Sequence, residues 1–153
     1  MIPESLKSFT KIMLPTQLKD NGDFDNNTYI DTVQNGTMWG HLCVKFLVGT
    51  TDAAIGSTAE TAAPKLEECD TTNGTYTAIT GAALADAIAG TEGDSIFAID
   101  LNLEGHKRYI QVNVPHAGDG TTGANLAIIG ELTKPQIAPI TAAQRGLVEN
   151  IVV

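Results

Sequence analysis

Several short segments of the chain alternate between apolar and polar residues, which is the pattern of a β-strand with one buried face. Segments 95–103 and 107–114 alternate in this way, and shorter strands are expected over 28–33, 65–70, 75–79 and 125–132. The clearest case is 39–48, where one face consists of Leu42, Val44, Phe46 and Val48. Short strands separated by turn residues predict an all-β fold, an antiparallel β-sandwich or jelly roll.

Turn residues stand between these segments. Asn35-Gly36 separates two of them, and this dipeptide favours a tight hairpin because both residues tolerate a positive φ. Asn73-Gly74 predicts a second tight turn.

One short helix is expected, over 81–90. Leu84 and Ile88 are four residues apart and surrounded by alanines, and a glycine stands at each end of the segment. At this length the helix would need tertiary packing to persist.

The two ends of the chain differ from its middle. Residues 1–27 show no regular period, and we expect them to form an N-terminal arm. Residues 133–153 are expected to form a C-terminal arm, since two prolines interrupt their first half and the remainder is unusually apolar. An apolar terminus is expected to pack on its own domain or on a neighbour. The β domain is therefore expected to span 28–132.

Composition adds that the core should be thin. The chain has 153 residues, a typical length for one domain. Aromatic residues are only 5% of it, and much of the 42% hydrophobic content is alanine. A thin core favours two packed sheets whose remaining apolar surface is covered by partners, so self-association is expected.

Charge and hydropathy exclude several classes of partner. Lys and Arg number 9 against 18 Asp and Glu, a formal net charge of −9 that repels phosphate backbones and anionic membranes. No segment reaches the roughly 18–20 apolar residues of a membrane span, and no secretory signal is recognised. The chain is thus expected to be made in a reducing cytoplasm, where Cys43 and Cys69 are better interpreted as buried thiols than as a disulfide.

No metal or cofactor site is predicted. His41, His106 and His116 fall on three separate segments. His41 and Cys43 share one strand face, but a zinc site needs about four ligands, so Cys69 and a second histidine would have to converge on them.

Catalysis and anion binding find no support either. The glycine-rich loop 118–123 lacks the Gly-Lys-Ser/Thr ending of a P-loop and joins two strands. Asp100 and Glu104 are interpreted as exposed carboxylates rather than as an acid/base pair. Asp119 and the acidic turn formed by Asp20, Asp23 and Asp25 lack the Glu that ends an EF-hand loop. The sequence predicts a protein that is not an enzyme.

Three segments carry a resemblance to a known family. Residues 107–114, Lys-Arg-Tyr-Ile-Gln-Val-Asn-Val, are similar to the "RYLRV" strand of the capsid cement proteins of tailed bacteriophages. Residues 120–129 resemble the closing Thr-Gly loop and last strand of that family, and 66–80 resembles its strand, turn and strand before the short helix. The stretch 44–132 thus resembles this jelly-roll, head-stabilising family.

The resemblance implies a function by attachment. A cement protein binds the outer surface of a capsid and cross-links subunits of the major capsid protein against the pressure of the packaged DNA. The expected location is the outer capsid surface of a virion assembled in the host cytoplasm, and the expected partners are the major capsid protein and further copies of this chain, as a dimer or a trimer. The residues expected to make contact are Ile12, Leu14, Trp39, Ile137, Ile140, Leu147 and Ile151.

The alternative is a carbohydrate- or receptor-binding β-sandwich module of a virion. Such a module stacks exposed aromatic side chains on sugar rings. The chain has one Trp, three Tyr and four Phe, and Trp39, at the start of a strand, is the best candidate for stacking.

Overall fold

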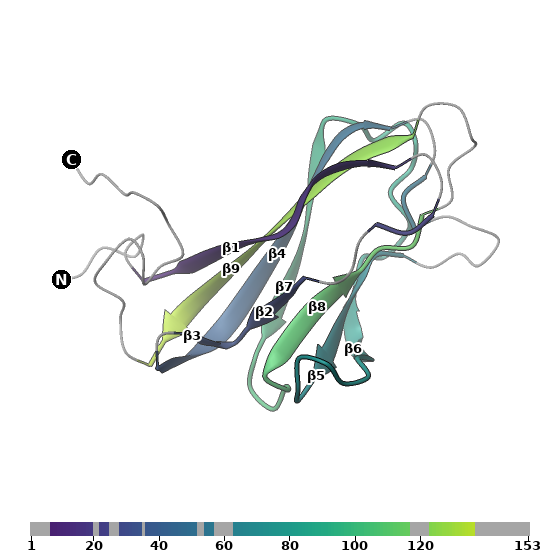
Figure 1. Ribbon diagram of the computed structural model, residues 1–153. Helices are drawn as coiled ribbons and strands as arrows, with labels where there is room; N and C mark the ends of the chain where they lie inside the picture. The colour runs from purple at the N-terminus through teal and green to yellow at the C-terminus, as the bar shows by residue number, and fades with distance from the viewer. Residues whose placement is uncertain are drawn as a thin grey trace, which may run out of the picture.

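The computed structural model describes residues 7–19, 22–24, 28–34, 36–51, 54–56, 63–116 and 123–136. These residues form strands joined by turns and loops, arranged in two antiparallel sheets (Figure 1). They include no helix, and therefore none that is long and apolar enough to cross a membrane. The strands are β1 (Phe9–Lys19), β2 (Tyr29–Asp31), β3 (Val33–Gln34), β4 (Thr37–Thr51), β5 (Lys65–Cys69), β6 (Thr77–Ala83), β7 (Ser95–Asn102), β8 (Tyr109–Asn113) and β9 (Ala124–Pro135).

The first sheet is built around β4 and β9, which pair along most of their length. β1 pairs with the other edge of β9, from Phe9 opposite Leu132 to Lys19 opposite Ala124. β7 pairs with the other edge of β4, and β3 pairs with the first residues of β4. The order across this sheet is thus β1-β9-β4, followed by β3 and β7.

The second sheet contains four strands in the order β2-β8-β5-β6. Both sheets contribute to one hydrophobic core, which includes Leu42, Phe46 and Ile128 of the first sheet and Leu66 and Ile110 of the second. Burial of an aliphatic or aromatic side chain of this size contributes roughly 1.5–3 kcal/mol, so the alternating apolar positions hold the two sheets together.

The predictions for the middle of the chain are largely confirmed. The segments expected at 39–48, 65–70, 95–103 and 107–114 are strands β4, β5, β7 and β8. All four side chains expected on the inner face of β4 are buried, whereas those between them are partly exposed. The mainly β class with antiparallel sheets is therefore shown.

The hairpin expected at Asn35-Gly36 is confirmed by the residues that flank it. Gln34 pairs with Thr37 and Val33 pairs with Met38, so a two-residue loop joins β3 to β4. Gly36 has a φ of 76°, a conformation that glycine adopts without steric cost.

The helix expected over 81–90 is wrong. Thr77–Ala83 form β6, and Ile88 forms an isolated bridge with Ile55. The two isoleucines exchange backbone hydrogen bonds, each 2.9 Å long, and both side chains are buried. A helix of under three turns is marginal because its nucleation is costly, so non-local pairing replaces it here.

The expected arms overlap the first sheet. Residues 9–19, assigned to an N-terminal arm, form β1, in which Met13 and Leu14 are buried. Pro15 lies where the register of β1 against β9 shifts, and an edge strand tolerates proline at such an irregularity. At the other end, β9 extends through Pro135, so residues 133–135 also belong to the sheet. Residues 1–6 and 137–153 lie outside the described part of the chain.

Candidate functional site

The outer face of the first sheet, which points away from the core, carries exposed hydrophobic side chains. Ile12 and Leu18 on β1 are 62% and 63% exposed, and Ile96 on β7 is 69% exposed. Among the described residues only one other large hydrophobic side chain is similarly open, Met38 at 55%. Soluble monomers rarely leave a large contiguous apolar surface open to water, so this face is the leading candidate for a contact site.

Strand pairing places these side chains on one face of the sheet, where Leu18 lies opposite the polar Asn125. Ile12 lies opposite Ile129 of β9, and Leu47 of β4 lies opposite both Ile96 and Ala127. Side chains directly opposite on one face of an antiparallel pair have Cβ atoms about 5 Å apart and therefore touch. We call this surface the apolar patch, and its members are Ile12, Leu18, Leu47, Ile96, Ala127 and Ile129.

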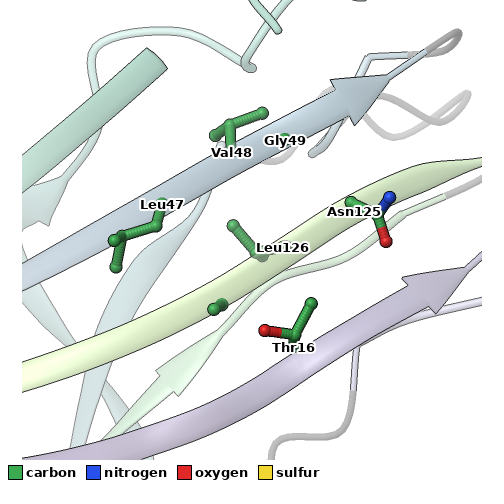
Figure 2. A pocket seen from close by; sticks show the side chains of 7 residues that line it. Thr16, Leu47, Val48, Gly49, Asn125 and Leu126 are labelled. Atoms are coloured by element: carbon green, nitrogen blue, oxygen red, sulfur yellow. The ribbon is translucent and has the colours of Figure 1, made fainter. Parts of the chain in front are cut away.

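A shallow hollow of about 410 Å³ lies within the patch (Figure 2). It is lined by Thr16 of β1, by residues 47–49 of β4 and by residues 125–127 of β9. Gly49 and Ala127 leave space because they have little or no side chain. The register shift in β1 between Leu14 and Gln17 falls beside the same place. The patch thus combines protruding isoleucines with a depression.

The other half of this face is polar. Lys45 Nζ lies 3.1 Å from Glu131 Oε2, and this hydrogen bond, together with the charge of Glu131, raises the pKa of Lys45. His41 Nε2 lies 3.4 Å from Asp100 Oδ1, and His41 Nδ1 lies 3.3 Å from the hydroxyl of Thr133. These groups are paired with one another within the chain.

The face as a whole is nearly uncharged. Its charged side chains are one lysine and two carboxylates, a formal net charge of −1, whereas the whole chain carries −9. Cys43 lies among them, and burial, with a further contribution from Asp100, raises the pKa of its thiol. A thiol that stays protonated is a weak nucleophile.

Of the residues predicted to make contacts, one is exposed, two are buried and four lie outside the described residues. Ile12 lies in the apolar patch, but Leu14 and Trp39 are only 3% and 4% exposed and belong to the core. Trp39 packs against Phe9, with ring centroids 6.3 Å apart. Both side chains are thus covered by the rest of the chain in this structure. The other four, Ile137, Ile140, Leu147 and Ile151, lie outside the described residues.

Trp39 is buried because β4 changes phase at its start. Thr37 and Trp39 are buried at odd positions, whereas from Leu42 to Val48 the even positions are buried. The change of phase falls around Gly40. The backbone of Gly40 lies close to Lys134, so that a Cβ atom added at Gly40 would lie 3.3 Å from the carbonyl oxygen of Lys134. A prediction that assumes strict alternation of buried and exposed positions over 39–48 therefore places Trp39 on the wrong face of the strand.

Sequence reasoning missed most of the apolar patch. Leu18, Leu47, Ile96, Ala127 and Ile129 were not among the expected contacts. The signal was nevertheless present, because Leu47 and Ile96 are large apolar residues at the polar positions of alternating strands. An interruption of this kind places apolar side chains on the solvent-facing side of the strands.

The three histidines do not meet. His106 Nδ1 lies 2.9 Å from Glu68 Oε2, near the turn between β7 and β8. His116 is 1% exposed, and its Nε2 lies 3.1 Å from the carbonyl oxygen of Lys19. His41 lies on the outer face described above. Each histidine therefore has its own local partner.

The remaining candidate ligands are also dispersed. Cys43 and Cys69 are free thiols on different sheets. Asp23 accepts a hydrogen bond from the backbone N–H of His116. Within the described ranges, no group of three or more His, Cys, Asp or Glu side chains is placed to hold a metal ion. The loop 118–122 and Asp20, Asp25 and Asp119 lie outside those ranges.

The edge of the second sheet formed by β2 and β8 carries an aromatic and ionic cluster. The rings of Tyr29 and Tyr109 meet edge to face, with centroids 5.2 Å apart. Lys11 lies over the ring of Tyr29 and Arg108 over that of Tyr109. Arg108 also donates two hydrogen bonds of 2.8 Å to Asp31. The rings are engaged within the chain, so this cluster joins the two strands instead of offering an open stacking surface.

A second hollow, which we call the strand-end groove, lies where β4 begins. Its volume is about 590 Å³, and it is lined by residues 38–40, by the turn 102–106, and by Lys134 and Gln136. The backbone N–H of Gln136 donates to the carbonyl oxygen of Met38 at 3.0 Å. The groove therefore adjoins the point at which the chain continues into residues 137–153.

Comparison with protein-family models, with curated proteins and with solved structures found no match to this chain.

Proposed function

We propose that the protein is a structural component of a virus particle, a decoration protein that stabilises a phage capsid by cross-linking subunits of the major capsid protein from the outside. The observation that carries this proposal is the division of the exposed large hydrophobic side chains between two places. Three lie in the apolar patch, and Met38 lies at the strand-end groove. A cross-linking protein needs two separate contact surfaces.

The two surfaces are far enough apart to engage different neighbours. Met38 and Leu47 are both on β4, and at about 3.3 Å per residue the strand separates them by roughly 30 Å. The backbone of β4 connects these surfaces directly, and its ladders with β9 and β7 hold that strand in place.

The proposal takes the two sheets as a jelly-roll β-sandwich. The shared core and the long antiparallel strands support this, as does the resemblance of 107–114 and 120–129 to the strands of phage cement proteins. The net charge of −9 suits a protein that must not adhere to packaged DNA.

The strand-end groove is the surface we assign to the coat protein. Met38 provides an exposed apolar contact there, and Gln136, which lines the groove, is the last described residue before the expected contact residues Ile137, Ile140, Leu147 and Ile151. A few residues that become buried contribute most of the binding energy in protein interfaces, and methionine is among the residue types enriched there.

The test is co-sedimentation of the purified chain with undecorated capsids, assembled from the major capsid protein of the genome that encodes it. We expect saturable binding and a higher melting temperature of the decorated capsid. Met38→Glu should weaken binding at least tenfold, whereas the matched Met38→Leu should bind like the wild type. A chain shortened after Gln136 keeps all of β9 and tests the tail separately.

Absence of wild-type binding to these capsids would contradict the proposal. The alternative, a carbohydrate- or receptor-binding module, predicts instead that the wild type binds defined glycans on an array while leaving capsids undecorated. Because Trp39 is buried, the Trp39→Ala variant does not test that alternative cleanly, so the comparison of capsids with glycans is made with the wild type.

A further inference from the structure

We propose that the apolar patch is the interface of a symmetric homodimer, in which a second copy of this chain covers the outer face of the first sheet. The inference rests on the proposed function for its biological role and deepens it by naming the occupant of one of the two surfaces. It also chooses between the dimer and the trimer that the sequence leaves open.

Charge is the first reason to assign this face to a second copy. Two chains that each carry −9 repel one another over most of their surfaces. No member of the apolar patch is charged, Lys45 beside Ile129 is paired with Glu131, and the charged side chains Lys45, Glu131 and Asp100 of this face sum to −1. Two copies therefore meet with least repulsion through this face.

Shape is the second reason. An isologous interface places the same surface on both sides of a two-fold axis, so each protrusion must find a depression on the same face of the other copy. Ile96 and Ile12 protrude at opposite edges of the sheet, on β7 and β1. The hollow lined by Thr16, Gly49 and Ala127 lies on the same face and is wide enough for an aliphatic side chain.

The position of the paired charges is the third reason. Glu131, Asp100 and His41 lie to one side of the patch along the strands, whereas Lys45, which pairs with Glu131, lies opposite Ile129 at the border of the patch. A two-fold axis that runs through the patch across the strands places the polar groups of the two copies at opposite ends of the interface. The result is an apolar centre with a polar rim, which is the usual anatomy of a protein interface.

The dimer is tested on the full-length chain in the absence of capsids. Multi-angle light scattering and sedimentation equilibrium should give twice the chain mass of 16.1 kDa for the wild type. Ile96→Glu should weaken the dimer by at least about 30-fold, the effect typical of a strong interface contact. Because Ile96 is 69% exposed, this variant should fold, as circular dichroism and the urea midpoint can verify.

Two further variants separate the dimer interface from other causes. Ala127→Trp fills the hollow without adding charge, and it should also give monomers. Met38→Glu makes the same chemical change as Ile96→Glu at an exposed apolar residue outside the patch, and it should leave the dimer intact.

The outcomes distinguish this inference from the proposed function. A wild type that remains monomeric up to ~100 μM, where even micromolar affinity would be visible, overturns the dimer. So do a trimer, a folded Ile96→Glu variant that dimerises like the wild type, and equal loss of dimer in Met38→Glu. A wild-type dimer that leaves capsids undecorated upholds this inference and rejects the decoration role.

Discussion

Met13 packs directly on the backbone of Gly130: a Cβ atom at Gly130 would lie 2.7 Å from Met13 Sδ and 3.2 Å from Ile30 Cδ1. The three residues belong to β1, β9 and β2, so this contact joins the edge of the first sheet to the edge of the second. The glycine is needed because side chains from two other strands occupy its side-chain position.

Gly130→Ala is therefore expected to destabilise the fold by about 1–3 kcal/mol, the usual effect of overpacking a core. Urea unfolding measures the loss. In the double variant with Met13→Ala, the new methyl group occupies space that the methionine leaves, so the combined loss should be smaller than the sum of the single losses. Strict additivity would show that Gly130 and Met13 do not compete for the same space.

Glu68 should make stability depend on pH. Burial opposes its ionisation, but hydrogen bonds from the Lys107 backbone N–H (3.0 Å) and from His106 (2.9 Å) outweigh burial, and the pKa of Glu68 lies below its ordinary value of 4.5. A carboxyl with a lowered pKa in the folded state stabilises the protein above its unfolded pKa. That contribution is lost as the pH falls through the lower folded value.

We therefore expect Glu68→Gln to unfold more easily than the wild type at pH 7, by about 1–2 kcal/mol, and this difference to shrink below pH 4. Urea midpoints at several pH values provide the measurement. Glu104→Gln, which changes an exposed carboxylate in the adjacent turn, should differ from the wild type by no more than about 0.5 kcal/mol. An equal difference between Glu68→Gln and the wild type at pH 7 and pH 3 would rule out this role for Glu68.

His116 should exist with its proton on Nε2. Its Nε2 faces the carbonyl oxygen of Lys19, which only accepts hydrogen bonds, while Nδ1 is buried without a hydrogen-bond partner among the described residues. Nitrogen-15 NMR of the imidazole distinguishes the two tautomers, and a proton found on Nδ1 alone would be incompatible with this geometry. His116→Ala should also cost about 2–3 kcal/mol, because it leaves a cavity beside Phe24 and an unpaired carbonyl.

Phe9 and Trp39 test whether β1 belongs to the core. Trp39 is the only tryptophan and is 4% exposed, so acrylamide should quench its fluorescence poorly in the native protein and efficiently in urea. Phe9→Ala removes the ring that packs on it and should cost about 3–5 kcal/mol. Efficient quenching in the native state, or a Phe9→Ala variant as stable as the wild type, would mean that residues 9–19 are a detachable arm.

The local sequence pattern predicted those strands in which apolar and polar residues alternate without a change of phase. In β8, Ile110 and Val112 are buried as expected, and in β7 so are Ile99 and Leu101. The hairpin before β4 was also predictable, because the conformational freedom of Asn35-Gly36 is a property of those residues alone.

Prediction failed where a partner distant in the chain decides the structure. β1 contains Pro15 and a register shift that disrupt its period, and it is a strand because β9 supplies its hydrogen bonds. Ile88 is extended because it pairs with Ile55, although Leu84 and Ile88 have helical spacing. Trp39 is buried because the phase of β4 changes near Gly40.

By itself, the sequence determined the β class, the acidic surface, and the inward face of the regular strands, since side-chain direction alternates along any extended backbone. Only the tertiary structure decided which strands lie side by side. That order brings Ile12, Leu47 and Ile96 together on one face, although they lie on three different strands. The apolar patch is therefore a product of strand order, which no local period encodes.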